Sequence, residues 1–275
     1  MNIISSVKDK YMKKISIITS KKYLKSKNYE SLIEILKSND IEYEILYVDE
    51  NIDLKITNSN LILSVGGDGT ALRAMKIAWL SKLPVLNIGS GRIGYLVNSL
   101  NDIDFNKIIK DKNLDNNKKR TPIIQNQNEN LPAFNEIVII KNSPTRILDI
   151  ELEVYDQKVK LRADGIIIST SLGSTAYNYS AGGPIVQTSI ESIIITPISP
   201  FTKFPRSIVV DSSSELKINI SKNQHYSIQF DGVEEYLSDT KSDEKFNYKL
   251  SSRSLRVFEE LDIPKLDLFL NQILR

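Results

Sequence analysis

The stretch LILSVGGDGTALRAM, residues 61–75, joins a short apolar run to a segment whose apolar residues recur at helical spacing. The run ends at Val65 and is short and rich in Leu, Ile and Val, which predicts a buried β-strand. The helical spacing continues beyond it through Ala71, Leu72, Met75, Ala78 and Trp79. The stretch therefore predicts a strand, a glycine-rich turn and a helix, with the turn at the C-terminal edge of a parallel sheet.

The first 100 residues repeat this alternation of short β-rich runs and helical patterns. A helix is expected at 28–40, and strands are expected at 14–20 (KISIITS), 43–48 (YEILYV), 60–65 (NLILSV) and 84–89 (PVLNIG). Strands that alternate with helices are typical of a parallel sheet covered on both faces. We therefore predict an N-terminal α/β domain with a parallel, Rossmann-like sheet.

The pattern changes after residue 120, because β-like runs continue with almost no helical spacing. These runs are 133–141, 147–156, 165–171, 192–199, 207–211, 215–221 and 226–232. Residues 101–120 are polar and rich in Asn, Asp and Lys, which is typical of a helix that frays into a linker. We therefore expect an α/β domain over 1–115 and an all-β domain over 116–254. Residues 255–275 are expected to return to the first domain, because apolar residues at helical spacing within 261–275 predict a C-terminal helix that packs back on it.

Composition restricts the chemistry that the chain can perform. The 275 residues include no cysteine and one histidine, His225, which excludes thiolate chemistry and disfavours imidazole-based metal sites or catalysis. The net charge of +2 lacks the basic field typical of nucleic-acid binding. No apolar segment has the length of about 18 residues that a membrane-spanning helix needs, and the N-terminus lacks a signal-peptide core. We expect a cytoplasmic protein without nucleic-acid or membrane partners, which uses carboxylates for acid–base chemistry on a small molecule.

The turn over residues 66–70 has the chemistry of an anion site. Glycine allows close approach of the backbone to a phosphate, and N–H groups at a helix N-terminus favour negative charge. The pattern matches neither the dinucleotide GxGxxG motif nor a Walker A motif. A tight turn in which Asp68 or Thr70 caps the helix accounts for the same residues. Because an acid repels phosphate, Asp68 is a candidate base or metal ligand.

A second polar segment is ADGIIISTSLGSTAYNYSAGGPIV, residues 163–186. It carries seven hydroxyl groups, on Ser169, Thr170, Ser171, Ser174, Thr175, Tyr177 and Ser180. A serine-rich surface loop is the simplest alternative. The flanking Asp164 and the apolar strand before the hydroxyls favour the lining of a polar pocket.

A third feature is the pair Asn135 and Glu136, which opens the apolar run FNEIVIIK. An amide beside a carboxylate can pair with an adenine edge or with sugar hydroxyls. The start of a strand explains the pair equally well. Arg73, Arg146 and Arg162 are ordinary surface arginines unless an anionic ligand lies near them.

Together these stretches resemble the NAD kinases in order and spacing. GGDGT also occurs in diacylglycerol and sphingosine kinases, whereas GSTAY followed by SAGGP is typical of NAD kinases. GRIGYLVNSL (91–100), IIITPISPF (193–201) and FDG (230–232) are similar to further family motifs, so the resemblance runs from about residue 14 to 250. Ser171, Leu172, Phe201 and Val233 depart from the bacterial pattern, which indicates an archaeal or divergent branch.

The resemblance implies an enzyme that transfers a phosphoryl group from ATP or polyphosphate to the 2′-hydroxyl of the adenosine ribose of NAD, with Mg²⁺, giving NADP. It implies a homo-oligomer, a dimer or tetramer, and Asp68 as the catalytic acid. No metal ligand is assigned. The residues that it implies in binding NAD and ATP are Gly66, Gly67, Gly69, Thr70, Arg73, Asn135, Glu136, Arg146, Arg162, Asp164, Leu172, Thr175, Ala176, Tyr177, Asn178, Tyr179, Ser180 and Ser199.

Two other functions fit parts of the sequence. A lipid kinase of the diacylglycerol or sphingosine type shares GGDGT but needs an apolar acceptor pocket, which the hydroxyl-rich segment does not favour. A noncatalytic NAD(P)-sensing module could use the same scaffold, but a pure binder has no need of Asp68.

Overall fold

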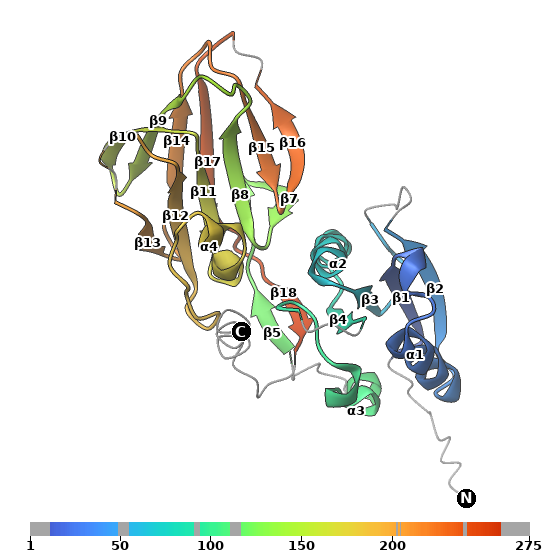
Figure 1. The fold of residues 1–275 in the computed structure, drawn as a ribbon. Helices are drawn as coiled ribbons and strands as arrows, with labels where there is room; N and C mark the ends of the chain where they lie inside the picture. Colours follow the sequence, from blue (N-terminus) through green and yellow to red (C-terminus); the bar gives the residue numbers. More distant parts are fainter. Residues whose placement is uncertain are drawn as a thin grey trace, which may run out of the picture. The chain divides into compact units, whose positions relative to one another are not determined.

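The computed structural model describes residues 12–48, 55–90, 94–110, 117–201, 203, 205–238 and 241–259 (Figure 1). These residues form two compact units. One contains the described residues up to Lys119 and those from Leu255, and the other runs from Arg120 to Ser254. Among the described residues, no helix has the length and apolar character needed to cross a membrane. The helix predicted near the C-terminus, over 261–275, lies outside the described residues.

The first unit is built on a six-stranded sheet with the order β2-β1-β3-β4-β18-β5. The pairs β1–β2, β1–β3, β3–β4 and β4–β18 are parallel, which confirms the predicted parallel sheet. Its strands are β1 (Lys14–Thr19), β2 (Glu42–Tyr47), β3 (Leu61–Gly66), β4 (Val85–Gly89), β5 (Asn117–Arg120) and β18 (Leu255–Phe258). Sequence patterns predicted the first four, whereas β5 and β18 join the sheet from much later in the chain.

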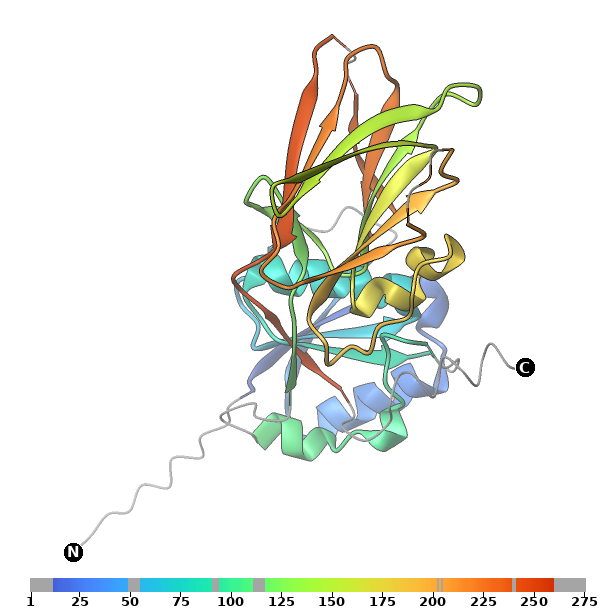
Figure 2. The same ribbon diagram turned by 90° about the vertical axis from the view of Figure 1, so that its left-hand side faces the viewer.

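Helices cover both faces of this sheet. The helix α2 (Asp68–Ser81) lies on one face, and α1 (Lys27–Ser38) and α3 (Phe105–Lys110) lie on the other (Figure 2). Short 3-10 helices, η1 (Lys21–Tyr23) and η2 (Leu100–Asp102), precede α1 and α3. The helix α1 begins after Ser26, whose hydroxyl accepts the Tyr29 N–H at 3.3 Å. Leu32 and Leu36 of α1 are fully buried in a core shared with β1 and β3.

The second unit is a sandwich of two six-stranded antiparallel sheets, which confirms the all-β prediction. The first has the order β10-β9-β14-β17-β6-β7 and the second β13-β12-β11-β8-β15-β16. One apolar core contains residues of both sheets. The strands are β6 (Ile123–Gln125), β7 (Asn128–Ala133), β8 (Glu136–Lys141), β9 (Leu148–Val154), β10 (Gln157–Ala163), β11 (Gly165–Thr170), β12 (Ser192–Ile198), β13 (Ile208–Asp211), β14 (Leu216–Ile220), β15 (Tyr226–Phe230), β16 (Val233–Leu237) and β17 (Glu244–Leu250).

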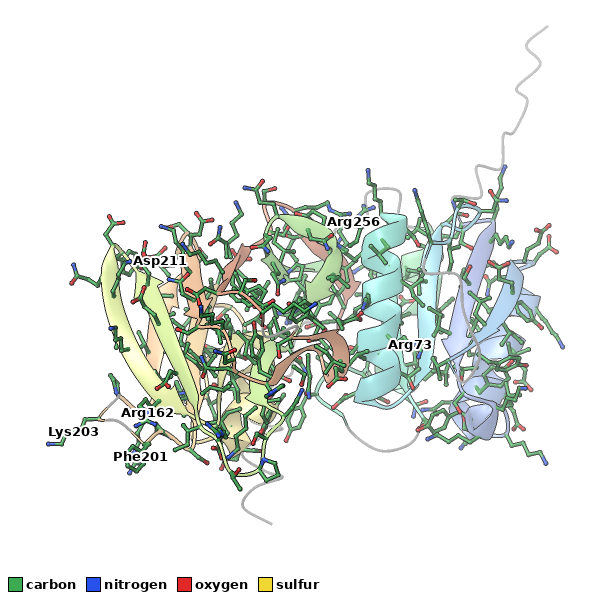
Figure 3. The ribbon with its side chains drawn as sticks, turned by 90° about the horizontal axis from the view of Figure 1, so that it is seen from above. Arg73, Arg162, Phe201, Lys203, Asp211 and Arg256 are labelled. Atoms are coloured by element: carbon green, nitrogen blue, oxygen red, sulfur yellow. The ribbon has the colours of Figure 1, made fainter. Side chains whose placement is uncertain are left out.

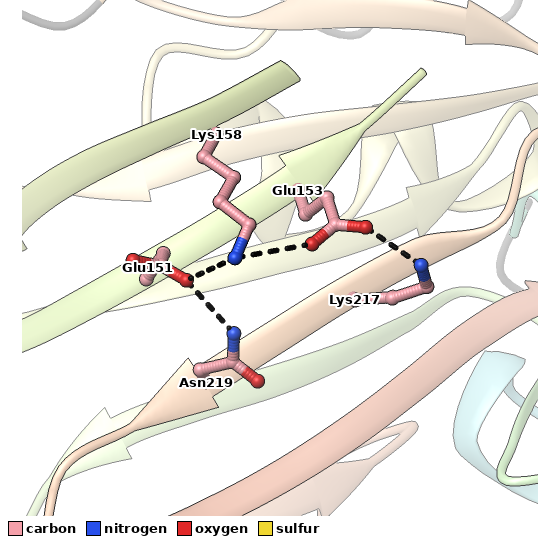
Figure 4. A network of polar contacts seen from close by, with 5 residues as sticks. All are labelled: Glu151, Glu153, Lys158, Lys217 and Asn219. Atoms are coloured by element: carbon pink, nitrogen blue, oxygen red, sulfur yellow. Dashed lines mark hydrogen bonds and ion pairs between the residues drawn. The ribbon is translucent and has the colours of Figure 1, made fainter. Parts of the chain in front are cut away.

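Charged side chains cover the outer face of the first sheet of the sandwich. Lys158 lies 3.4 Å from Glu151 and 3.7 Å from Glu153, and Lys217 lies 2.6 Å from Glu153 (Figure 4). Asn219 donates to Glu151 at 3.0 Å. Such cross-strand pairs on an exposed face add little individually, and they mark this face as a solvated surface.

Candidate active site

The glycine-rich turn follows β3 directly, and the described residues leave open space at the start of α2. A Cβ on Gly66 would overlap the Thr70 side chain, whereas among the described residues outside the turn and the backbone of α2 no atom lies within 4 Å of the Cβ position of Gly67 or Gly69. Neither of these two glycines has a positive φ, so the backbone does not require glycine there. The helix that begins here has 14 residues. Open space beside N–H groups at a helix N-terminus is suited to an anion such as phosphate.

The Asp68 carboxylate is held by a segment that follows β4. Its Oδ2 accepts the N–H of Tyr95 at 3.0 Å, and its Oδ1 accepts the N–H of Leu96 at 2.9 Å. A Cβ on Gly94 would overlap Oδ1. Burial, and then the nearby Asp68 carboxylate, raise the pKa of the Tyr95 hydroxyl. Two N–H donors fix the orientation of the carboxylate and leave a lone pair on each oxygen for another partner.

A second carboxylate, on Asp231, organises the start of β8 in the sandwich. It lies between β15 and β16 with φ 51° and accepts the N–H groups of Phe134 at 2.8 Å, Asn135 at 2.7 Å and Glu136 at 3.2 Å. Sequence reasoning did not nominate Asp231. The signal for it was the FDG motif, which was noted without a role.

The segment after β11 packs against the same strand start. The Asn135 carbonyl accepts the Thr170 N–H at 2.9 Å, and a Cβ on Gly173 would overlap that carbonyl. The 3-10 helix η3 (Leu172–Thr175) and the short helix α4 (Tyr177–Ser180) follow. The Asn135 side-chain amide is partly exposed and has no partner among the described residues. The fold thus brings residues 134–136, 170–175 and 231 together, around one free amide.

Four of the seven hydroxyl groups hold the chain together. Ser169 donates to the Asn135 carbonyl at 3.2 Å, Thr170 to the Phe134 carbonyl at 2.6 Å, and Ser174 to the Val186 carbonyl at 3.1 Å. Ser171 donates to the Ile190 carbonyl. All four residues are buried. Thr175, Tyr177 and Ser180 are at least partly exposed, so these three can contact a ligand.

The Asn178 side chain also stabilises the chain by hydrogen bonds. Its side chain is fully buried, and its Nδ2 donates to the carbonyls of Ser174 at 3.1 Å and Pro184 at 3.0 Å. Its Oδ1 accepts the Thr196 hydroxyl at 2.7 Å. The Asn178 carbonyl in turn accepts the Gly183 N–H at 2.9 Å. The residue therefore holds the loop in place.

The remaining residues of this segment present apolar and aromatic surface. Leu172 and Ala176 are partly exposed, and the Tyr177 and Tyr179 side chains are 39% and 40% exposed. Exposed tyrosine rings on a short, well-packed helix provide flat faces against which a planar ring can stack.

The charged residues that were predicted to bind a ligand lie in several places. Arg162 pairs with Asp149 at 2.9 Å and lies over the Phe201 ring (Figure 3). Asp164 pairs with Lys141 at 2.6 Å. Among the others, Arg73 is exposed on α2, Arg146 is exposed between β8 and β9, and Ser199 is exposed after β12 with φ 45°. Arg162 and Asp164 thus have ion-pair partners within the chain, beside any role toward a ligand.

Glu136 is the most unusual acid of the second unit. Its side chain is buried, and the Tyr177 N–H donates to its carboxyl group. Its Oε2 atom is buried and has no hydrogen-bond partner among the described residues. Burial, and then the negative charge of Asp231, raise its pKa to about 8. A group with this pKa carries a proton at neutral pH.

Family comparisons cover most of the chain. The ATP-NAD kinase N-terminal domain family matches residues 4–112, and the ATP-NAD kinase C-terminal domain family matches residues 134–256. An NAD kinase of Caldicellulosiruptor bescii is 32% identical over 235 residues, which are 83% of this chain and 86% of that protein. An NAD kinase of Methanosphaera stadtmanae is 33% identical, over 70% of this chain and 74% of that protein.

Other relatives are matched over less of their length. The chain spans 38% of the bifunctional NADP phosphatase/NAD kinase of Methanocaldococcus jannaschii, at 34% identity over 78% of this chain. It spans 60% of the NAD kinase of Methanothermobacter thermautotrophicus, at 38% identity over 61% of this chain.

Solved structures share the fold at low sequence identity. An Archaeoglobus fulgidus NAD kinase, crystallised with ATP, has a TM-score of 0.75 and 23% identity over 94% of this chain and 98% of that one. A yeast NADH kinase complexed with NADH has a TM-score of 0.73 and 20% identity over 96% of this chain and 88% of that one. With both domain families matched and relatives above 30% identity covered over most of their length, the chain belongs to the NAD kinase family.

Proposed function

We propose that the chain is an NAD kinase that transfers a phosphoryl group from ATP, or from polyphosphate, to the 2′-hydroxyl of the adenosine ribose of NAD. The observation that carries this proposal is the Asp68 carboxylate, which is fixed by two backbone N–H groups beside open glycine positions at a helix N-terminus. An acid in that position suits a base that takes the proton of an acceptor hydroxyl next to bound phosphate.

The N-terminal unit supplies the phosphate-binding groups in this proposal. Gly67 and Gly69 leave room for phosphate oxygens, and the first N–H groups of α2 stabilise the charge that develops on them. Gly66 and Thr70 shape the turn, because the Thr70 side chain fills the space that a Cβ on Gly66 would take. Arg73, exposed on α2, is available to an anionic group.

The sandwich unit supplies the groups that recognise NAD. The free Asn135 amide and the Glu136 carboxyl group offer hydrogen bonds to base or sugar atoms, and Thr175, Ala176, Tyr177, Tyr179 and Ser180 offer exposed hydroxyl and ring surface. Leu172, Asn178 and Ser199 contribute through backbone or packing contacts. Arg146, Arg162 and Asp164 are assigned to ligand binding by family resemblance.

Magnesium is expected with the phosphoryl donor. The described residues contain no group of three or more His, Asp or Glu side chains that could hold a metal ion. We therefore assign no residue of this chain to Mg²⁺, which commonly keeps waters and binds substrate phosphates. When bound there, it neutralises negative charge on the phosphate oxygens. A cytoplasmic location and a dimer or tetramer remain expectations from the family resemblance.

The rival functions make different demands on the same residues. A lipid kinase needs an apolar acceptor surface, whereas the region around Asn135 presents a free amide and hydroxyl groups. A sensing module needs no fixed carboxylate at the phosphate-binding turn.

The test is a coupled assay of the full chain with NAD, Mg²⁺ and either ATP or polyphosphate, in which an NADP-specific dehydrogenase detects the product. We expect product with at least one donor. Replacing Asp68 with Asn should lower kcat by roughly 10²- to 10⁴-fold and leave the Kd for NAD nearly unchanged. NAD binding without turnover in the wild-type chain would favour the sensing module, and transfer to diacylglycerol would favour the lipid kinase.

A further inference from the structure

The Glu136 carboxyl group lies in an environment that offers it one hydrogen bond. Glu136 is the first residue of β8, and 6% of its surface is exposed. The Tyr177 N–H donates to the carboxyl group, while Oε2 is buried without a hydrogen-bond partner among the described residues. A buried oxygen with no partner in a candidate binding site points to a partner that arrives with a ligand.

Among the described residues, the elements packed around Glu136 bring one charged group. The turn between β15 and β16 brings Asp231, whose carboxylate accepts three backbone N–H groups. The strand β11 brings Ser169, opposite Glu136 in register, whose hydroxyl donates to the carbonyls of Asn135 and Thr170. The helix α4 brings the Tyr177 N–H. Asp231 is thus the one charged side chain of the described residues that acts on Glu136.

These surroundings favour the protonated form of Glu136. A buried carboxylate without a cation is costly, and a second carboxylate nearby makes it more so. Burial and Asp231 accordingly raise the pKa of Glu136 to about 8. A protonated carboxyl group can accept from Tyr177 through one oxygen and donate through the other. Among the described residues, nothing accepts that second hydrogen bond.

We propose that Glu136 recognises NAD as a hydrogen-bond donor, through the proton on its carboxyl group, and that NAD binds less tightly once this proton is lost. This inference rests on the proposed function. The NAD atom that accepts the hydrogen bond is uncharged, such as an adenine ring nitrogen, a ribose oxygen or the carboxamide oxygen. A phosphate is disfavoured because the Asp231 carboxylate lies close by.

The wild-type chain provides the first test, by calorimetric titration of NAD into the full chain at pH 7 and pH 9. Because the protonated fraction of a group with a pKa of about 8 falls about tenfold between these pH values, we expect Kd to rise about tenfold. At pH 8.5, buffers of different ionisation enthalpy should reveal uptake of about three quarters of a proton per NAD bound. A Kd and a proton count that do not change with pH would overturn the proposal.

The Glu136→Gln variant distinguishes a side chain that donates a hydrogen bond to NAD from one that accepts it. Its amide N–H₂ group donates at every pH, and its carbonyl can still accept from Tyr177. We expect the same Kd at pH 7 and pH 9, and binding about tenfold tighter than wild type at pH 9. A variant that binds NAD more weakly than wild type at both pH values would mean that Glu136 acts as a carboxylate acceptor, which contradicts the proposal.

Glu234→Gln is the matched control, because Glu234 is an exposed carboxylate on β16. It should keep the wild-type pH dependence. Thermal unfolding verifies that each variant folds, and if Glu136→Gln does not, the wild-type titration and proton count decide alone. Absence of NAD binding by the wild-type chain at both pH values would instead overturn the proposed function, and this inference with it.

Discussion

The Oδ1 atom of Asp68 accepts the backbone N–H of Leu96 at 2.9 Å, across 28 positions of sequence. Asp68 begins α2 just after β3, and Leu96 follows β4, the neighbouring parallel strand, in which Gly89 pairs with Gly66. The two residues therefore meet at the edge of the sheet where β3 and β4 end. The orientation of the proposed base depends on this segment after β4 as much as on the glycine-rich turn.

Gly94→Ala tests that dependence without removing the carboxylate. The added Cβ would overlap Asp68 Oδ1, so the carboxylate or the segment must move. A displacement of about 1 Å can lower turnover by about 10²-fold, and we expect kcat to fall by that order while the KM for NAD changes little. Steady-state kinetics and thermal unfolding measure both effects. Wild-type kcat in a folded variant would show that the position of Asp68 does not matter for turnover.

Gly69→Ala distinguishes a phosphate site from a simple turn. Gly69 is the second residue of α2, and among the described residues outside the turn and the backbone of α2 no atom lies within 4 Å of its Cβ position, so alanine should raise the free energy of unfolding by about 0.5–1 kcal/mol. The same methyl group would occupy space that we assign to phosphate, so the KM for the donor should rise. If stability rises and the KM for the donor does not change, this glycine serves the turn alone.

Asn135 and Asn178 form a matched pair for NAD recognition. The Asn135 amide has no partner among the described residues, so Asn135→Ala should leave the melting temperature unchanged and raise the KM for NAD by roughly 5- to 150-fold, the loss of about 1–3 kcal/mol. Asn178→Ala removes three hydrogen bonds from a buried loop and should lower the unfolding free energy by about 1–3 kcal/mol. Equal loss of stability in both variants would contradict the assignment of Asn135 to the ligand.

Asp211 should make the sandwich sensitive to acid. Hydrogen bonds from Ser213 and then from the Tyr155 hydroxyl lower the pKa of this carboxyl group to about 2, from an ordinary value of 3.8. Because the folded-state pKa is the lower one, the stabilisation is present above about pH 4 and is lost as the pH falls toward 2. We expect the melting temperature of Asp211→Asn to fall less than that of the wild type between pH 4 and pH 2. Asp156→Asn, an exposed turn residue, is the control and should follow the wild type.

Local patterns predicted the strands β1 to β4 of the first sheet but neither β5 nor β18. The strands β1 to β4 are short apolar runs beside helical patterns, and both signals are local. The strand β18 pairs with β4 across about two thirds of the chain, which no local pattern encodes. In the sandwich, β10 (QKVKLRA) buries only Leu161 and Ala163, so its charged edge positions obscure the alternation expected of a strand.

Some residues of the candidate site could likewise be predicted from the sequence, and others could not. Asp68, Asn135 and Glu136 stand within or beside motifs and were nominated from sequence. Asp231 and the Gly94–Leu96 segment were not nominated, because their importance comes from backbone hydrogen bonds that only the folded chain makes. The hydroxyl groups of residues 169–174 were interpreted as pocket lining, whereas their main partners are carbonyl groups of the chain. Composition alone cannot distinguish these two uses of a hydroxyl group.

The most direct measurement of the central claim is a phosphoryl-transfer assay with an NAD analogue that lacks the 2′-hydroxyl on its adenosine ribose. If Asp68 takes the proton from that hydroxyl, the analogue should bind, inhibit competitively against NAD and accept no phosphoryl group. The product formed from NAD itself should then be a substrate for an NADP-specific dehydrogenase. Phosphorylation of the deoxy analogue, or a product that this dehydrogenase does not use, would contradict the account.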